Sequence, residues 1–331
     1  MKTQPIKSPA VWYGQELFDR EDWLVELSPS LVGEIHQAVA TDASSESFRL
    51  PDDLVERLAS VQDSLENGSG AVLIRGFDPG DFTVDQLKSL FLSVSSRVGT
   101  VLPQSADGTK VFSVRNAGFA DDDPRARGPN TKKKLSFHTD RCDVIGFLCV
   151  RQAKEGGDNQ LVSSAALFNE VLERRPDLLE VLMQPYCYQR HNFDLANELP
   201  YTEQPIFSIH EGYFAANFLR VLIDRAHNNP DLPSLSEQQI EALDLLESVA
   251  AESKMHVTFR LQPGDIVFMN NWITLHRRTA FEDHESPELR RHILRTWLSM
   301  PNSRPVDPMF AGNYGATGAG EIRGGIKLQK P

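Results

Sequence analysis

Hydrophobic residues recur at helical spacing through most of the first hundred positions of the chain. They repeat every three to four residues over 31–40, 52–65 and 84–98, which is typical of amphipathic helices. Between the last two segments, positions 71–77 form a short apolar run of the kind expected for a buried strand. The pattern predicts a helix-rich N-terminal part that contributes one strand.

Beyond about residue 100 the pattern changes to short strand-like runs separated by turn residues. The run 143–152 is almost continuously apolar, and Gly156-Gly157-Asp158 separates it from a second run. Glu211-Gly212 and Gln262-Pro263-Gly264 separate two further pairs of runs. We interpret the three pairs as hairpins: 143–152 with 160–163, 205–210 with 213–217, and 256–261 with 265–270. The last strands are expected at 273–278 and 291–299.

Many strands joined by turns, with a few inserted helices, predict a mainly β chain of the α+β class, folded as a jelly roll or antiparallel sandwich. The clearest inserted helix begins at Ser236, which forms a capping box with Gln239. Leu235 and Ile240 are predicted to form a hydrophobic staple there. The apolar positions Ile240, Leu243 and Leu246 follow helical spacing.

We expect a single domain over residues 1–331, because no sequence period repeats and no Pro/Ser-rich linker divides the chain. It would consist of a helix-rich part (1–100), a jelly-roll core (100–300) and a Gly-rich C-terminal tail (301–331). The tail lacks the flanking strand and helix of a phosphate-binding loop. It is predicted to be a loop or to dock on the surface.

Composition and charge narrow the class of protein. The longest apolar runs fall well short of the roughly 18 residues that a membrane helix needs. The formal net charge of −12 argues against sequence-independent binding to nucleic acid. The N-terminus lacks the pattern of an export signal, and the 3 cysteines form no CxxC pair. We therefore expect a cytoplasmic protein with no membrane or nucleic-acid partner; a homo-oligomer is compatible with this composition.

Three residues form a candidate metal site. His138 and Asp140 are two positions apart, so on a strand they would share one face at roughly 6.6 Å. A His-x-acid pair is expected about once by chance from this composition, so the pair alone indicates little. His276 follows a Pro-Gly-Asp turn, a strand and a polar corner. Two histidines and one carboxylate can bind octahedral iron and leave three positions open. The alternative is a buried histidine with no metal.

An alternating segment near the C-terminal end of the core carries two arginines. Arg291, Ile293, Arg295 and Trp297 would share one strand face. If that face is interior, each guanidinium needs an anion, and a ligand carboxylate suits the planar fork. The alternative is an outward face on which the arginines pair with acids at 282–288.

The order and spacing of these motifs resemble the TauD/TfdA-like, clavaminate synthase-like branch of the Fe(II)- and 2-oxoglutarate-dependent oxygenases, from about residue 100 to 300. The resemblance implies a double-stranded β-helix in which His138, Asp140 and His276 bind Fe(II). It also implies that Arg291 binds the distal carboxylate of 2-oxoglutarate. The family's threonine after the Gly-Gly-Asp turn is Asn159 here, whose amide could donate the same hydrogen bond.

The resemblance also implies a reaction. An unactivated C–H bond of a small carboxylate or amino-acid-like substrate would be oxidised, most simply hydroxylated, while O2 is consumed and 2-oxoglutarate becomes succinate and CO2. Arg295 matches the family's arginine that meets the substrate anion, and Arg115 and Arg220 are further candidates for that pocket. The alternative for Arg295 is a salt bridge with an acid such as Asp143.

Other readings of the site stay open at this stage. The same iron chemistry could end in desaturation or cyclisation. Halogenation is disfavoured, because halogenating relatives lack the carboxylate that Asp140 supplies. From different classes, the chain could be a non-catalytic jelly-roll protein that binds a metal or ligand, or a zinc hydrolase, although tetrahedral zinc needs only one open position and no arginine.

Overall fold

The computed structural model describes residues 3–41, 48–80, 82–119, 128–190, 194, 197 and 199–327. Its main element is a seven-stranded sheet, antiparallel apart from its first pair of strands. In spatial order the sheet contains β1 (Leu24–Glu26), β2 (Ala71–Arg75), β13 (Ile266–Asn270), β5 (Val144–Arg151), β16 (His292–Ser299) and β3 (Thr100–Leu102), and β4 (Phe112–Val114) also pairs with β16.

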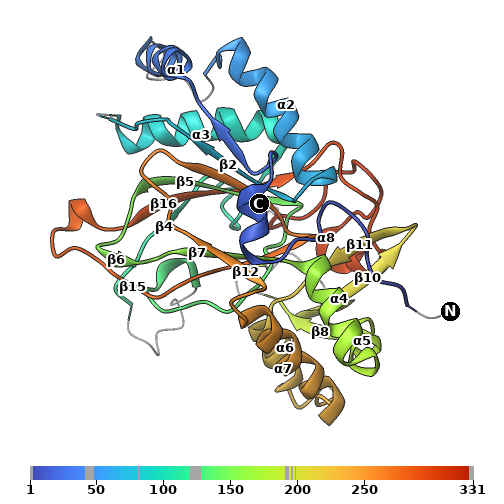
Figure 1. Cartoon of the computed structure of the whole chain (residues 1–331). Coiled ribbons are helices and arrows are strands. Elements are labelled where there is room, and N and C mark those ends of the chain that lie inside the picture. Colours follow the sequence, from blue (N-terminus) through green and yellow to red (C-terminus); the bar gives the residue numbers. More distant parts are fainter. Residues whose placement is uncertain are drawn as a thin grey trace.

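Three helices cover the outer face of this sheet, as Figure 1 shows at the top. They are α1 (Pro29–Thr41), α2 (Asp52–Asn67) and α3 (Val84–Val98), and they confirm the helical spacing in the sequence. Their apolar stripes pack on β2, β5, β13 and β16, for example Leu58 and Phe91 with Phe268. Burial of this stripe explains why the periodicity alone predicted these helices.

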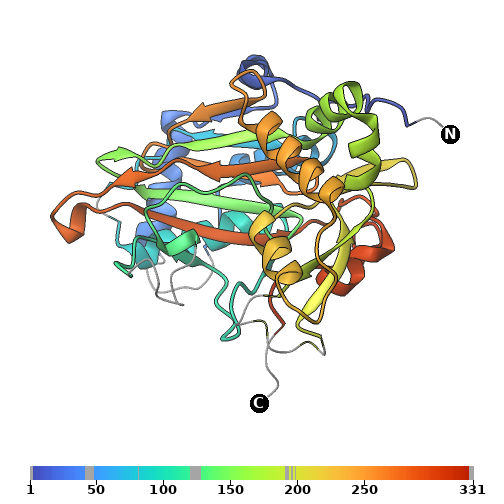
Figure 2. The same cartoon turned by 90° about the horizontal axis from the view of Figure 1, so that it is seen from below.

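A smaller sheet faces the main one. It contains β12 (His256–Phe259), β7 (Asn159–Ser163) and β14 (Thr274–Arg278), and β6 (Glu155–Gly156) pairs with β15 (Phe281–Glu282) beside it. Side chains from both sheets, including Leu161, Met269 and Trp297, form one apolar cluster. The two layers of strands are seen from below in Figure 2. They form the jelly-roll core that the sequence predicted.

Two of the three predicted hairpins are wrong. β5 pairs with β13 and β16 in the main sheet, whereas β7 pairs with β12 and β14 in the smaller sheet. Likewise β12 and β13 lie in different sheets. In both places the turn residues carry the chain from one sheet to the other, and turn chemistry alone does not reveal this. The third hairpin, β10 (Phe207–His210) with β11 (Tyr213–Ala216), is confirmed.

A long insertion between β7 and β12 forms its own apolar cluster with the end of the smaller sheet. It contains α4 (Ser164–Arg174), α5 (Pro176–Leu182), the hairpin of β8 (Pro185–Gln189) with β9 (Tyr201–Pro205), then β10, β11, α6 (Arg220–His227) and α7 (Glu237–Ala251). The Ser236 capping box of α7 is present. Leu243 and Leu246 are buried, whereas Ile240, near the start of the helix, is 42% exposed.

The C-terminal tail is more deeply integrated than a surface loop. It contains η4 (Pro308–Phe310) and α8 (Ala311–Tyr314), and Phe310, Tyr314 and Arg323 are buried. Backbone hydrogen bonds then tie Gly325 to Arg141 and Ile326 to Pro103. The remaining short elements are η1 (Gly14–Asp19), η2 (Gly128–Asn130) and η3 (Pro287–Leu289).

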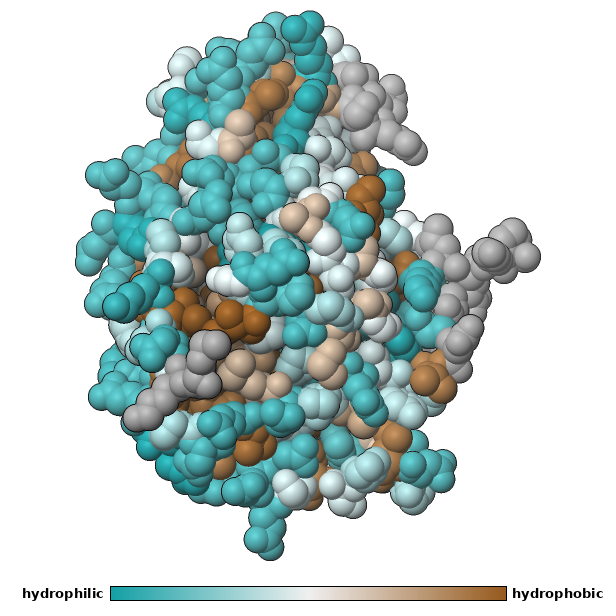
Figure 3. Space-filling model, turned by 90° about the vertical axis from the view of Figure 1, so that its right-hand side faces the viewer, coloured by the Kyte–Doolittle hydropathy of each residue, from teal (hydrophilic) through white to brown (hydrophobic). Residues whose placement is uncertain are grey.

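Among the described residues, no helix combines the length and apolar character required to cross a membrane. On the face in Figure 3, hydrophobic side chains form separate patches between hydrophilic ones. Large apolar side chains that are exposed include Leu199, Ile209, Tyr213 and Ile322.

Candidate metal centre

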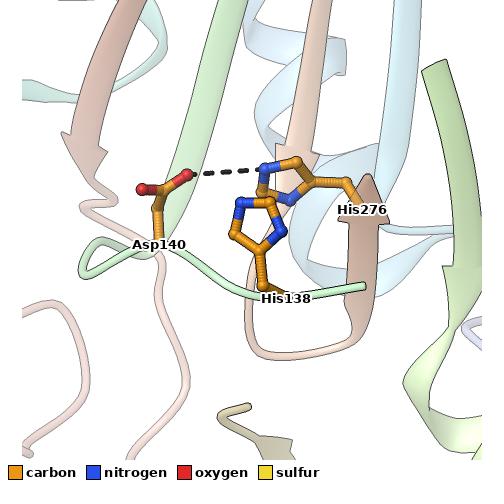
Figure 4. Close-up of side chains that lie close together, drawn as sticks. All are labelled: His138, Asp140 and His276. Carbon is orange, nitrogen blue, oxygen red and sulfur yellow. Dashed lines mark ion pairs between the residues drawn. The ribbon is translucent and has the colours of Figure 1, made fainter. Parts of the chain in front are cut away.

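The side chains of His138, Asp140 and His276 lie close together (Figure 4). Each offers one ligand atom, and these atoms lie within 4.8 Å of one another. His138 lies in the loop before β5 and His276 on β14, and their backbones exchange two hydrogen bonds of 3.0 Å. This single bridge brings the imidazole centroids to 4.4 Å. Asp140 Oδ2 lies 3.4 Å from His276 Nε2.

The polar corner between β13 and β14 supports the loop that carries Asp140. The Asp140 backbone N–H donates to Asn271 Oδ1 at 3.0 Å, and Asn271 Nδ2 donates to the Cys142 carbonyl at 3.2 Å. The Thr139 N–H donates to the carbonyl of Phe218 at 2.8 Å. The corner therefore connects the first two candidate ligands to the strand that carries the third.

Hydrogen bonds, burial and nearby charges keep His138 and Asp140 in the protonation states that bind a metal. His138 Nδ1 lies 2.8 Å from the Ser136 carbonyl and donates to it, which leaves Nε2 free as a ligand. Burial, and next the neighbouring His276, lower the pKa of His138 to about 4, so its ring is neutral near pH 7. Burial alone would raise the pKa of Asp140, but Arg295 and the two histidines hold it below its usual value. Neutral imidazole and ionised carboxylate are the forms that bind metal.

Arg291 precedes β16 and is only 3% exposed. Its Nε and Nη1 atoms are buried and have no hydrogen-bond partner among the described residues, and the same is true of Asn159 Nδ2 at the start of β7. Burial lowers the pKa of Arg291 to about 10, so the guanidinium stays charged near pH 7. Unpaired buried donors of this kind are costly unless a ligand satisfies them.

The other arginine of the segment, Arg295, is 8% exposed and lies next to the candidate ligands. Its Nε donates to Gln104 Oε1 at 2.7 Å and its Nη1 to Asp140 Oδ1 at 3.4 Å. Of the two alternatives left open for this segment, the structure therefore has the interior one, with both Arg291 and Arg295 buried. The alternative, a salt bridge with an acid, is confirmed in kind, because Arg295 pairs with Asp140. Asp143, the acid named as an example, is wrong, since it pairs with Arg323 instead.

The two weaker arginine candidates lie in different surroundings. Arg115 is an exposed residue directly after β4. Arg220, at the start of α6, forms ion pairs with Asp224, Asp244 and Glu247. Neither forms a hydrogen bond or an ion pair with His138, Asp140 or His276 in the described part of the chain, so a role in binding substrate stays a prediction for both.

Several residues around the site were not indicated by the sequence pattern. Gln104 Nε2 donates to the Arg295 carbonyl at 2.8 Å, while its Oε1 receives the Arg295 side chain. Tyr314, from the Gly-rich tail, donates its hydroxyl to the Asp140 carbonyl at 3.4 Å. Only tertiary structure brings these residues to the site, so no local signal could have found them.

The residues present fit an octahedral metal and a dicarboxylate. Two imidazoles and one carboxylate are a donor set that leaves positions open for other ligands. Arg291 and Asn159 add buried donors that lack partners among the described residues and are suited to a carboxylate.

Comparisons with known proteins agree with this fit. The family model described as "Taurine catabolism dioxygenase TauD, TfdA family" matches residues 32–297. The chain is 28% identical to FR-33289 synthase from Streptomyces rubellomurinus, over 91% of this chain and 92% of that protein. It is also 28% identical to taurine hydroxylase-like protein SAT17 from Stachybotrys chartarum, over 92% of this chain and 85% of that protein.

Solved structures share the fold at low sequence identity. Asparagine oxygenase, in complex with Fe(II), 3-hydroxyasparagine and succinate, superimposes with a TM-score of 0.65 at 19% identity, covering 84% of this chain and 93% of that one. The non-haem iron oxygenase OrfP, in complex with iron and α-ketoglutaric acid, gives a TM-score of 0.63 at 15% identity, with coverage of 83% and 94%.

Proposed function

Because the chain belongs to the TauD/TfdA dioxygenase family, we propose that it hydroxylates an unactivated C–H bond of a small carboxylate or amino-acid-like substrate. The chain is an Fe(II)- and 2-oxoglutarate-dependent oxygenase. In the proposed reaction, one atom of O2 enters the hydroxylated product and the other enters succinate, while the C1 carboxylate of 2-oxoglutarate leaves as CO2.

One observation carries this proposal. The His138, Asp140 and His276 ligand atoms lie within 4.8 Å of one another, in a core where Arg291 retains buried donors without described partners. A structural metal site would not require such an arginine, and four-coordinate zinc would need only one open position. The three ligand atoms together with the unpaired donors of Arg291 support a metal whose open positions are occupied by an anionic cosubstrate.

In this proposal His138, Asp140 and His276 bind Fe(II), which together with 2-oxoglutarate supplies the oxidising chemistry when bound. Arg291 binds the distal carboxylate of 2-oxoglutarate, and Asn159 Nδ2 donates a second hydrogen bond to it. The Gly157 turn packs against Arg291: a Cβ added to Gly157 would lie 3.1 Å from Arg291 Nε. The protein thus contributes mainly position and exclusion of water.

Arg295 is the proposed anchor for the substrate's anionic group. Its guanidinium carbon lies 5.3 Å from the ring centroid of Phe112 and 4.9 Å from that of Trp297. Its bond to Asp140 brings it beside the metal ligands. Solved relatives of this fold include complexes with hydroxyasparagine and with L-Arg, which supports screening amino acids first.

The test is a screen of small carboxylic acids and amino acids with Fe(II), 2-oxoglutarate and O2, scored by succinate and by the mass of the product. A gain of one oxygen atom supports hydroxylation, whereas loss of two hydrogens would indicate desaturation or cyclisation instead. His138→Ala should abolish succinate formation at an unchanged melting temperature. His210→Ala, which changes a histidine on β10 outside the site, is the matched control. Full iron-dependent turnover by His138→Ala would show that the ligand assignment is wrong.

A further inference from the structure

Arg141 directly follows Asp140, and one edge of its guanidinium has no partner. Its Nη1 donates to Asp194 Oδ2 at 2.5 Å and to Asn313 Oδ1 at 3.2 Å. Its Nε and Nη2 are both buried and make no hydrogen bond within the described residues. These two atoms form the side edge of the guanidinium, so a complete bidentate fork is unused.

In other arginines of this protein, the corresponding edge of the guanidinium binds a carboxylate. Arg75 uses Nε and Nη2 to hold Asp265, at 3.0 and 2.6 Å. Arg175 uses Nε and Nη2 to hold Asp177, at 2.9 and 2.7 Å. The same edge of Arg141 has no such partner among the described residues, although Arg141 is more buried than Arg75 and Arg175. Arg291, the proposed 2-oxoglutarate residue, also has unpaired buried donors in the described part of the chain.

A second arginine increases the positive charge beside this fork. Arg190 Nη1 lies 3.6 Å from the same oxygen of Asp194, and its other nitrogens donate to the carbonyls of Leu199 and Gly312. The remaining oxygen of Asp194 accepts from Asn197 at 2.7 Å. Two guanidinium groups thus share one carboxylate, which leaves a net charge of about +1 in this group of residues.

Burial makes that excess charge costly. The side chains of Arg141, Arg190 and Asp194 are only 13%, 9% and 1% exposed. Burial lowers the pKa of Arg190, and Asp194 only partly offsets that effect. A buried cation with unpaired donors is stabilised by an anion that can accept two parallel hydrogen bonds, and carboxylate and phosphate oxygens have this geometry.

We propose that Arg141 and Arg190 form an anion site next to the metal-binding loop, in which the free edge of Arg141 binds a carboxylate or phosphate group of a small molecule. The site is distinct from Arg291 and Arg295, because its contacts are with Asp194, Asn313 and the tail rather than with the candidate ligands. The group bound there is a second anionic group of the primary substrate, remote from the one that Arg295 anchors. That assignment of source rests on the proposed function, whereas the anion site itself does not.

The experiment observes Arg141 directly. The full chain, labelled with 15N-arginine and loaded with Zn(II) and 2-oxoglutarate to keep it diamagnetic and Arg291 occupied, is titrated with acetate and, separately, with inorganic phosphate. The Arg141 Nε–H resonance, identified by its loss in Arg141→Lys, should shift with at least one probe. Because lysine cannot form the bidentate fork, Arg141→Lys should weaken binding of that probe about tenfold or more. Arg174→Lys, in a surface ion-pair group, is the matched control.

No shift at Arg141 with either probe up to about 0.1 M, or shifts confined to other arginines, would overturn the site; affinities weaker than this correspond to roughly 1 kcal/mol or less. Turnover distinguishes the source. If the anion belongs to the substrate, Arg141→Lys raises the substrate KM about tenfold, whereas the control Arg174→Lys does not change it. An unchanged KM alongside the resonance shift would overturn the substrate assignment and identify a separate small anion as the ligand. Absence of any succinate from the unmodified protein would instead contradict the proposed function.

Discussion

At the scale of single residues, Arg291 is the most direct test of cosubstrate binding. Its buried donors lack partners among the described residues, so replacing Arg291 should weaken the binding of 2-oxoglutarate specifically. A charged hydrogen bond is worth about 1.5–3 kcal/mol, so Arg291→Ala should raise the KM for 2-oxoglutarate roughly 10- to 100-fold. The matched control is Arg290→Ala, since Arg290 is exposed and bonds only to the carbonyls of His284 and Glu285 in the described structure. An unchanged KM would assign the carboxylate to another residue.

The lowered pKa of the next residue, His292, predicts how the stability of the protein depends on pH. Burial, and then Arg115 and Arg151, lower its pKa to about 4, whereas an unfolded histidine titrates near 6.5. The unfolded chain therefore binds the proton first, and stability falls as the pH drops from about 6.5 to about 4. Urea unfolding at a series of pH values measures this. Over this pH range, the free energy of unfolding should fall by up to about 3 kcal/mol less in His292→Gln than in the unmodified protein. His138, whose pKa is also lowered, is common to both proteins. Parallel stability curves would contradict the assignment.

How far the sequence predicts the site depends on how local each contact is. The spacing within His138-Thr139-Asp140 and the alternation from Arg291 to Arg295 are local, so both could be recognised before the structure. The partners that orient these residues are not local: Gln104 is 191 positions from Arg295, and Asn271 is 131 positions from Asp140. Polar partners at such separations leave no periodic signal in the sequence.

At the scale of elements, the turn before β7 is predicted to control Arg291. Gly157 has φ of +75°, and an added Cβ would lie 3.1 Å from Arg291 Nε. Gly157→Ala should therefore cost about 1 kcal/mol or more of stability and also raise the KM for 2-oxoglutarate. Gly212→Ala is the control, because its φ is +84° and nothing lies within 4 Å of the added atom. Equal effects of the two substitutions on KM would show that only backbone strain matters.

Strand pairing was harder to predict than strand position. The runs at 143–152, 160–163 and 265–270 all contain strands, yet two expected hairpins are crossovers between sheets. The reason is visible at Gly264, where an added Cβ would lie 1.8 Å from the Phe77 carbonyl oxygen. This turn is shaped by packing against a distant segment, as well as by its own Pro-Gly-Asp sequence. A single sequence specifies the local turn but not the sheet that receives the next strand.

At the scale of the whole molecule, one buried carboxylate joins the metal-binding loop to the C-terminal tail. Asp143 accepts hydrogen bonds from Trp272 Nε1 at 2.7 Å and from the Met300 backbone at 2.8 Å. It also forms a 2.5 Å ion pair with Arg323, and neither side chain is exposed. The loop of Asp140, the corner before His276, the end of β16 and the tail therefore meet at one point, which the Gly-rich composition of the tail did not predict.

Arg323→Met should consequently be among the most damaging substitutions remote from the chemistry. Removing one partner of a buried ion pair leaves an uncompensated charge and costs about 3–5 kcal/mol, whereas Arg174→Met, in an exposed ion pair, should cost about 1 kcal/mol or less. Urea unfolding measures both. Adding Asp143→Asn to Arg323→Met should recover part of the loss, because the unpaired charge is then removed.

Because the Gly325 N–H bonds to the Arg141 carbonyl, next to Asp140, Arg323→Met should also weaken Fe(II) binding under conditions in which the protein remains folded. Equal stability losses for Arg323→Met and Arg174→Met, with unchanged affinity for Fe(II), would contradict this prediction. They would mean that the contacts of Arg323 stabilise neither the fold nor the metal-binding loop.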